Sequence, residues 1–438
     1  MRRSSLPEKS RRFSIPRMLG LPSVRGHVPL VTALGIDAVG TGLAGPLVLL
    51  YLSTVAGLPI ATAGIVVTSA GVISLAVPAV SALISGRVGP KAIVIFALVL
   101  QGAGTGGLLL AAVPGGPVLP VVIGCCLLNA VGGRAFWSSV FALIADAADS
   151  AEAAARVEPA AEGGARTGKE AWFALSGMTQ GVGYTLGALI AGALLIIPGT
   201  LPYLIALTVN AASFLVAALL LARDPGHPRP EPGSDQQDHP HTGVHRDWPY
   251  LVLIGANTLF AFCSTILSVG LPLYVVQGLN APAWLIGPLL ALNTVLGATC
   301  QGIAVRVTRR FRRIRVLVFA GLLWAGWGIA TAALGLAPVW LLVPALFCSV
   351  LLYSVAELTH APVSMGLASD AAPTAVRASY LSWFQYSFAL ATIAAPGAFA
   401  VTFAVDPALP WLITTAVAGL GSAGILLAGR GLAERIRE

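Results

Sequence analysis

Long apolar runs, separated by short polar or glycine- and proline-rich segments, dominate the chain. A bilayer core about 30 Å thick needs roughly 20 apolar residues per crossing helix, and twelve runs meet that length. We predict helices over residues 28–52, 61–84, 92–113, 118–145, 171–197, 203–222, 249–276, 285–305, 316–336, 339–367, 380–403 and 409–428. Glycine and proline mark several turns between them, at 114–117, 198–202 and 406–407.

The composition supports insertion into a membrane. Of the 438 residues, 56% are hydrophobic and only 10% are charged, whereas a soluble domain carries about 25% charged residues. The first apolar run is too long for a signal peptide, whose apolar region has about 7–15 residues. We therefore interpret it as a retained first helix. The five cysteines lie inside apolar runs and show no metal-binding spacing.

The basic residues fall on one side of this layout. Of the 26 lysines and arginines, all except Arg134 lie in the two terminal segments or in loops that alternate along the chain. The positive-inside rule then places both termini in the cytoplasm of a multi-pass protein of the plasma (inner) membrane. The basic cluster 306–315 fits a short cytoplasmic loop in contact with lipid headgroups, so we expect no nucleic-acid partner.

A proline- and histidine-rich segment divides the chain. Residues 223–248 contain His227, His239, His241 and His245 and are interpreted as a solvated linker, with loose metal binding as the alternative. The predicted organisation is a cytoplasmic arm (1–27), a six-helix bundle (28–222), the linker (223–248), and a second bundle with a tail (249–438).

The two halves repeat each other. Residues 127–146 align without a gap on residues 351–370, so the fourth helix matches the tenth. Parallel repeats of six helices, with a binding site between them near the membrane midplane, are a transporter architecture. We therefore predict an all-α membrane protein with twelve transmembrane helices in two pseudo-symmetric six-helix bundles.

Three charged residues, Asp37, Arg134 and Glu357, fall inside predicted helices. A charge at the bilayer centre costs at least ~2.5–3.5 kcal/mol, so such residues usually have a function or a partner. At 1.5 Å per residue, Asp37 lies ~14 Å and Arg134 ~16 Å from the cytoplasmic ends of their helices. Their similar depth predicts an ion pair lining a cavity, and Glu357 aligns with Gly133 at the equivalent level of the other half. His360 is either the partner of Glu357 or a residue of the cytoplasmic end.

These three residues are the candidates for proton coupling. Desolvation favours the protonated form of a carboxyl group, and a neighbouring arginine favours the ionised form. A carboxyl group that moves between the two environments couples proton binding to conformation. The alternative is that the charges only lock helices together.

Other polar and aromatic residues within the apolar runs are candidates for binding a substrate. Trp137 and Trp383 can stack on an aromatic or cationic ligand. Taken singly, each of these residues is more often a helix-packing contact. The candidate substrate-binding residues are Asn129, Gln180, Tyr184, Asn257, Asn293, Gln301, Tyr353, Trp383, Gln385 and Tyr386.

The segment Gly86-Arg-Val-Gly-Pro-Lys91 between the second and third helices resembles the signature loop of the major facilitator superfamily, Asp-Arg-x-Gly followed by basic residues. Arg87, Gly89 and Lys91 match, whereas Gly86 stands in place of the Asp and Pro90 in place of a basic residue.

Further residues are similar to the twelve-helix drug:proton antiporter branch of that superfamily. Arg134 matches the arginine of helix four that is implicated in proton relay, and an acidic residue in helix one, here Asp37, is common among the drug exporters. The fifth helix resembles the glycine-rich antiporter motif but lacks its Gly-Pro pair. The glycines of that helix are Gly177, Gly181, Gly183 and Gly187.

The resemblance implies a proton-coupled secondary transporter that exports hydrophobic or amphipathic small molecules. The alternatives are a proton symporter or exchanger for a polar metabolite and a non-transporting membrane scaffold. The sequence has no Walker loop, nucleophile elbow or metal-ligand helix, so we expect neither an enzyme nor a cofactor or metal. The expected partners are a small-molecule substrate, protons and the lipid bilayer, and we expect a functional monomer.

Overall fold

The computed structural model describes residues 27–113, 118–157, 169–224, 244–308, 310–373 and 377–432. Within these ranges the chain is almost entirely helical and contains no β-strand, which confirms the predicted all-α fold. The arm 1–26 and His227, His239 and His241 of the linker lie outside the described residues.

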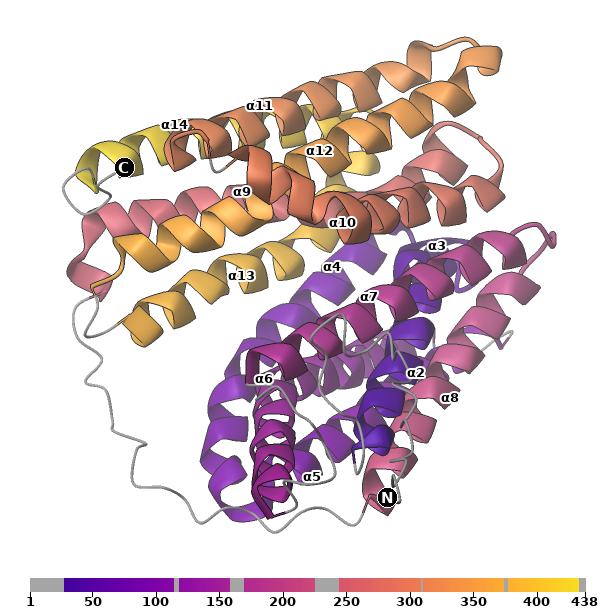
Figure 1. Ribbon diagram of the computed structural model, residues 1–438. Coiled ribbons are helices and arrows are strands. Elements are labelled where there is room, and N and C mark those ends of the chain that lie inside the picture. Colours follow the sequence, from indigo (N-terminus) through magenta and orange to yellow (C-terminus); the bar gives the residue numbers. More distant parts are fainter. Residues whose placement is uncertain are drawn as a thin grey trace, which may run out of the picture.

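The N-terminal half contains the first six predicted crossings (Figure 1). Its helices are α2 (Val28–Ala44), η1 (Gly45–Leu47), α3 (Val48–Thr54), α4 (Ile60–Ile73), η2 (Ser74–Ala76), α5 (Val77–Gly107), η3 (Leu108–Ala112), α6 (Val118–Val157), α7 (Lys169–Leu194) and α8 (Leu201–Arg223). The first arm of α5 continues the crossing begun by α4, and its second arm forms the next crossing. The two arms meet at Gly89, whose φ of 80° and ψ of 158° are not helical.

The C-terminal half contains the other six. Its helices are η4 (Val244–Arg246), α9 (Trp248–Leu273), η5 (Tyr274–Gly278, a π-helix), η6 (Ala283–Leu285), α10 (Ile286–Thr308), α11 (Arg313–Ala332), η7 (Ala333–Leu336), α12 (Val339–Ala371), α13 (Arg377–Phe403) and α14 (Leu409–Gly431).

Among the described residues, nine helices are long and apolar enough to cross a membrane by themselves. A pair of helices within residues 283–308, bent by 51°, is a tenth when its two arms are taken as one span. The remaining two predicted crossings are α4, which is short because it continues into α5, and α7. The fourth crossing is longer than predicted, since α6 runs on past residue 145 to Val157.

Each half is a bundle with its own packing. In the N-terminal half, α2 lies against α7 and α8, while α5 lies against α6 and α8. The C-terminal half repeats this plan: α9 packs on α13 and α14, and α11 packs on α12 and α14.

The two halves meet chiefly along α4 with α13 and along α7 with α10. One apolar core continues through both halves at the end that holds α3, whereas a second core at the other end of the N-terminal half includes no residue of the C-terminal half. Figure 1 accordingly shows the halves converging toward α3 and diverging toward the opposite end. We call these the closed end and the open end.

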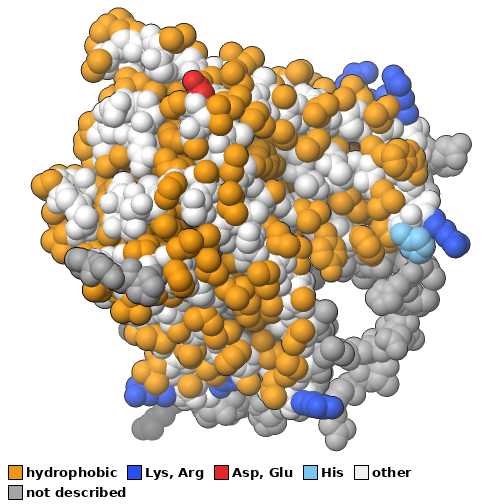
Figure 2. Space-filling view, turned by 180° about the vertical axis from the view of Figure 1, so that it is seen from behind, with side chains coloured by type: hydrophobic (Ala, Val, Ile, Leu, Met, Phe, Trp, Pro, Cys, Tyr) orange, Lys and Arg blue, Asp and Glu red, His pale blue; other side chains and the backbone are white. Residues whose placement is uncertain are grey.

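Hydrophobic side chains cover the outside of the molecule. Many large apolar residues are exposed, including Phe96 (61%), Phe319 (53%) and Leu420 (63%). Figure 2 shows one face covered by hydrophobic side chains, with Lys and Arg at its margins. An exposed apolar surface of this extent needs a lipid environment.

Candidate functional site

Asp37 lies inside the N-terminal half, where α2 and α7 approach closely. A Cβ added at Gly183 would lie 2.6 Å from the Cβ of Ala38 and 3.0 Å from the carbonyl oxygen of Gly35. Only glycine at this position of α7 lets the two backbones come so near. Asp37 is 5% exposed and lies beside Tyr184 of α7. The carboxyl group is therefore enclosed between two helices of one half.

Arg134 does not form the predicted ion pair with Asp37. Its Nη2 donates a hydrogen bond to the carbonyl oxygen of Ala389 on α13, 3.3 Å away, in the other half. The structure records no ion pair between Asp37 and Arg134. Similar depth does not bring the two side chains together, because Asp37 of α2 faces α7 whereas Arg134 of α6 bonds to α13.

Glu357 lies in the C-terminal half, on α12. Its carboxyl group is close to the side chains of Asn293 on α10 and of Tyr353, one turn earlier on α12. Ser354 donates a hydrogen bond to the Oδ1 of Asn293, 2.8 Å away, and the Tyr353 hydroxyl donates to the carbonyl oxygen of Ser264 on α9. Glu357 thus belongs to a polar group shared by three helices.

The hydrogen-bond partner of the His360 side chain is Asn257, not Glu357. The Nε2 of His360 is 3.0 Å from the Oδ1 of Asn257, and the Nδ2 of Asn257 donates to the Oγ of Ser387, 2.6 Å away. Because the amide oxygen of Asn257 accepts, Nε2 of His360 is the donor. This chain of hydrogen bonds links α12, α9 and α13. The imidazole ring lies between Phe260 and Trp324, with centroids 5.4 and 5.0 Å away.

The remaining candidate residues fall into three groups. Asn129 donates to Thr105 Oγ1 at 2.7 Å, and Gln180 donates to Ser176 Oγ at 3.1 Å, so both bond within their own half. The three candidates on α13 are exposed, as is Trp137 on α6. The exposed fraction is 42% for Trp383, 51% for Tyr386 and 43% for Trp137, and Gln385 is also exposed. Gln301 is partly exposed on the second arm of the bent α10.

The signature loop forms the break in α5. Gly89 has the positive φ that glycine adopts readily, and Pro90 begins the following arm, where its fixed φ and missing N–H suit a helix start. Lys91 donates a hydrogen bond to the backbone carbonyl of Asp224 just after α8. Arg87, in the first arm, is exposed.

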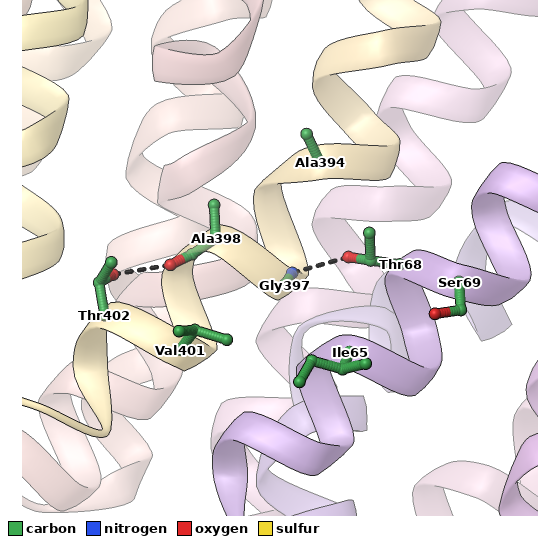
Figure 3. A pocket seen from close by; sticks show the side chains of 8 residues that line it. All are labelled: Ile65, Thr68, Ser69, Ala394, Gly397, Ala398, Val401 and Thr402. Atoms are coloured by element: carbon green, nitrogen blue, oxygen red, sulfur yellow. Dashed lines mark hydrogen bonds between the residues drawn. The ribbon is translucent and has the colours of Figure 1, made fainter.

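Contacts between the halves at the closed end are close enough to bring backbone against backbone. A Cβ added at Gly192 of α7 would lie 2.6 Å from the Cα of Gly287 on α10. The side chain of Gln277 donates to Ser53 Oγ, 3.0 Å away. On the other seam, α4 and α13 border a hollow of about 400 Å³, which Figure 3 shows with Ile65, Thr68 and Val401 on its walls. None of the candidate site residues lines this hollow.

Several partners in these contacts were not predicted. Ser387, Thr105 and Thr68 are small hydroxyl residues within apolar helices, where they usually bond to their own backbone. Pro396 and Gly397 in α13 were the available signal, because proline leaves a gap in a helical hydrogen-bond ladder.

The sequence profile described as "Major Facilitator Superfamily" matches residues 30–396. None of the curated proteins compared with the chain matches its sequence. Among solved structures, the nucleoside transporter NupG is similar with a TM-score of 0.71 and 12% identity, covering 94% of this chain and 98% of that one.

Two further solved structures have the same fold. The inward-open xylose transporter XylE from E. coli has a TM-score of 0.63 and 15% identity, covering 91% of this chain and 95% of that one. A bacterial homologue of the iron transporter ferroportin, in an inward-facing state, has a TM-score of 0.66 and 15% identity, with coverages of 95% and 99%.

Proposed function

The chain belongs to the Major Facilitator Superfamily, and on that basis we propose that this secondary transporter exports hydrophobic or amphipathic small molecules in exchange for protons. Family and fold together make it a multi-pass membrane transporter rather than an enzyme. The proposal covers three points: the class of compound that is transported, the coupling to protons, and the outward direction of transport.

Two observations together carry the proposal: the halves contact each other along two seams at one end, and each half encloses a carboxyl group, buried for Asp37 and partly buried for Glu357. The halves touch through α4–α13 and α7–α10 at the closed end and diverge toward the other. A rigid-body rocking of two such halves opens each end in turn. Asp37 in one half and Glu357 in the other can each take up and release a proton as their surroundings change.

The open end is proposed to face the cytoplasm. The described cationic residues that end or begin helices there include Lys91, Arg223 and Arg313, as the positive-inside rule requires of a cytoplasmic side. Two similar solved structures bear inward-facing descriptions. A ligand would then enter from the cytoplasm or the inner leaflet.

The residues exposed on helices of both halves favour a ligand with flat apolar groups. Trp137 of α6 and Trp383 and Tyr386 of α13 present aromatic surfaces, and the rings of Trp383 and Tyr386 lie 5.9 Å apart. Aromatic rings contribute large contact areas and attract cations. Arg134 is half-buried on α6, three residues before Trp137, and its guanidinium bonds to Ala389 of α13.

Proton exchange explains why Asp37 and Glu357 lie where they do. An ionised carboxylate enclosed without a cationic partner is costly, and binding a proton removes that cost. In the proposed cycle, proton uptake from outside and ligand release accompany one another. Ligand and proton therefore weaken each other's binding by the same factor, as linkage requires.

The decisive experiment uses purified protein in liposomes loaded with a pH-sensitive dye. A panel of lipophilic cations, aromatic antibiotics, nucleosides, sugars and peptides is offered, and ligand flux and proton flux are recorded together. We expect opposite fluxes of protons and a lipophilic compound. Parallel fluxes with a polar metabolite would instead establish symport, and no flux with any class would favour a scaffold.

A further inference from the structure

Thr68 of α4 places its hydroxyl group in the backbone of α13, across the boundary between the halves. The hydroxyl oxygen accepts a hydrogen bond from the N–H of Gly397, 2.8 Å away, and the hydroxyl donates to the carbonyl oxygen of Ile393, 3.0 Å away. Figure 3 shows Thr68 pointing at Gly397 from the facing helix. One side chain of the N-terminal half therefore uses both its donor and its acceptor on the C-terminal half.

The two backbone groups of α13 that bond to Thr68 are ones that would normally bond to each other. Residues 393 and 397 are four apart, so in a regular α-helix the N–H of Gly397 bonds to the carbonyl of Ile393. Thr68 lies between two natural partners. The neighbouring residue is Pro396, which has no N–H and already weakens the ladder at this turn. A side chain inserted into a ladder is a known cause of a helix bend.

Two glycines make this approach possible. A Cβ on Gly397 would lie 2.5 Å from the Oγ1 and 3.0 Å from the Cβ of Thr68. A Cβ on Gly64, one turn before Thr68, would overlap Ala400 and lie 2.9 Å from the carbonyl oxygen of Pro396. Larger residues at either position would hold α4 and α13 apart and leave the hydroxyl out of reach.

We propose that Thr68 is a clasp that works by exchange of hydrogen-bond partners. When the halves part, the N–H of Gly397 bonds to the carbonyl of Ile393 within α13. The hydroxyl of Thr68 turns back to the carbonyl of Gly64 within α4. This inference rests on the proposed function in one respect, that the two halves separate at this end during transport.

Other threonine hydroxyls of this protein donate hydrogen bonds to a carbonyl of their own helix, as proposed for Thr68 in the separated state. Thr54, Thr179 and Thr258 each donate to the carbonyl four residues earlier in the chain, at 2.6, 2.8 and 2.9 Å. Thr68 has a carbonyl at the same spacing, on Gly64. Its hydroxyl thus has a bond available in both states.

Partner exchange changes the energetics of opening. A buried backbone N–H or carbonyl left without a partner is strongly unfavourable, and more so where lipid excludes water. Here every polar group that the clasp releases finds another partner at once. The seam can then be held by two hydrogen bonds in the closed arrangement without a large cost for breaking them.

The test measures the separation of the halves directly. Spin labels are attached at Ile196→Cys and Val405→Cys, on exposed positions at the closed end of each half (69% and 76% exposed). The five native cysteines are replaced by alanine. The distances between the two spin labels are measured by double electron–electron resonance spectroscopy, in liposomes without ligand or pH gradient. The variants are Thr68→Val, Thr68→Ser and Thr68→Ala.

Thr415→Val is the matched control. Thr415 also bonds to a backbone carbonyl of another helix, that of Ala325 at 3.1 Å, but within the C-terminal half. We expect Thr68→Val and Thr68→Ala to raise the ratio of separated to closed molecules about tenfold, since the closed state loses both hydrogen bonds of Thr68 whereas the separated state loses only the bond to Gly64, a net difference of about one hydrogen bond. Thr68→Ser should stay close to the parent protein, and so should Thr415→Val.

An unchanged distance distribution in Thr68→Val and Thr68→Ala would overturn the clasp, as would a serine variant that behaves like valine. If the valine variant does not fold, the alanine–serine comparison still decides. The distance measurement involves neither ligand nor a proton gradient. It therefore tests the clasp even if the protein proves not to export its substrate.

Discussion

The guanidinium of Arg134 on α6 donates a hydrogen bond to the carbonyl oxygen of Ala389 on α13, 3.3 Å away. The bond joins the two halves near the midpoints of α6 and α13. It also directs the arginine away from Asp37, which lies beside Tyr184. The cation and the carboxyl group therefore act in different places, and their roles can be separated by mutation.

The first prediction is that Asp37→Asn and Arg134→Gln have additive effects on stability. Residues that do not interact usually add within about 0.5 kcal/mol, whereas an ion pair shows a coupling of 0.5–3 kcal/mol. Thermal unfolding of both single variants and the double variant in detergent measures the coupling. Asp37→Asn should also lose proton-driven transport while remaining folded. A coupling above 1 kcal/mol would show that the pair forms.

The second prediction concerns the contact of α2 with α7. Gly183→Val should destabilise the protein by about 1–3 kcal/mol or prevent its accumulation, because the side chain would overlap Ala38. Gly181→Val is the control on the same helix, since a Cβ there meets no atom within 4 Å. Melting temperature in detergent distinguishes them. Equal losses would mean that both glycines serve the helix itself and not the contact.

A third prediction addresses the chain from His360 to Ser387. Asn257→Leu removes the acceptor for His360 and the donor to Ser387, so two buried polar groups lose a partner at about 1–3 kcal/mol each. Thr299→Val serves as the control, because the exposed Thr299 hydroxyl bonds to a carbonyl of its own helix. If Asn257→Leu lowers the free energy of unfolding no more than Thr299→Val does, the hydrogen bonds from His360 to Ser387 do not stabilise the fold.

The exposed ion pair of Arg313 with Asp370 should matter little. The two side chains are 37% and 52% exposed, and such pairs contribute about 0–1 kcal/mol. We expect Asp370→Asn to change the unfolding free energy by less than about 1 kcal/mol, and the change should shrink in high salt. A larger loss that persists in high salt would indicate that Asp370 supports another contact.

Membrane orientation is a separate prediction. A reporter fused after Pro202 or Asp406 should read as external, and one fused at Gly233 or at the C-terminus should read as cytoplasmic. An external signal at Gly233 would contradict the twelve-helix topology.

Much of the fold could be predicted from the sequence because lipid leaves few choices. A crossing segment must be apolar and satisfy its own backbone, so run length located nearly every helix. Where α6 continues past residue 145 to Val157, hydropathy carried no signal, because this alanine-rich segment also contains Asp146, Asp149 and Glu152 and is not apolar. The interruption predicted between residues 84 and 92 is present, but the structure reduces it from a loop to a single non-helical residue, Gly89.

The site was harder to predict, for a geometric reason. Counting residues gives depth, since each adds 1.5 Å along the axis, but the direction around the axis turns by about 100° per residue and depends on how the helix is rotated in the bundle. Asp37 and Arg134 were placed at similar depth without knowing that they face different helices. Pro396 and Gly397 marked a weak point in α13, but nothing in the sequence pointed to Thr68 as its partner, because Thr68 bonds to backbone groups of a helix more than 300 residues away.

The length of α6 has a consequence for observing the protein at work. Its 40 residues give a rod of about 60 Å, roughly twice the hydrocarbon core of a bilayer. The segment near Ser150 therefore lies beyond the hydrocarbon core, and it stays packed on the open end of the N-terminal half, where Ala147 and Ala148 are buried and Ser150 contacts His27. Because this end moves with its half as one body, a fluorophore attached there would report the tilt of the N-terminal half from outside the hydrocarbon core.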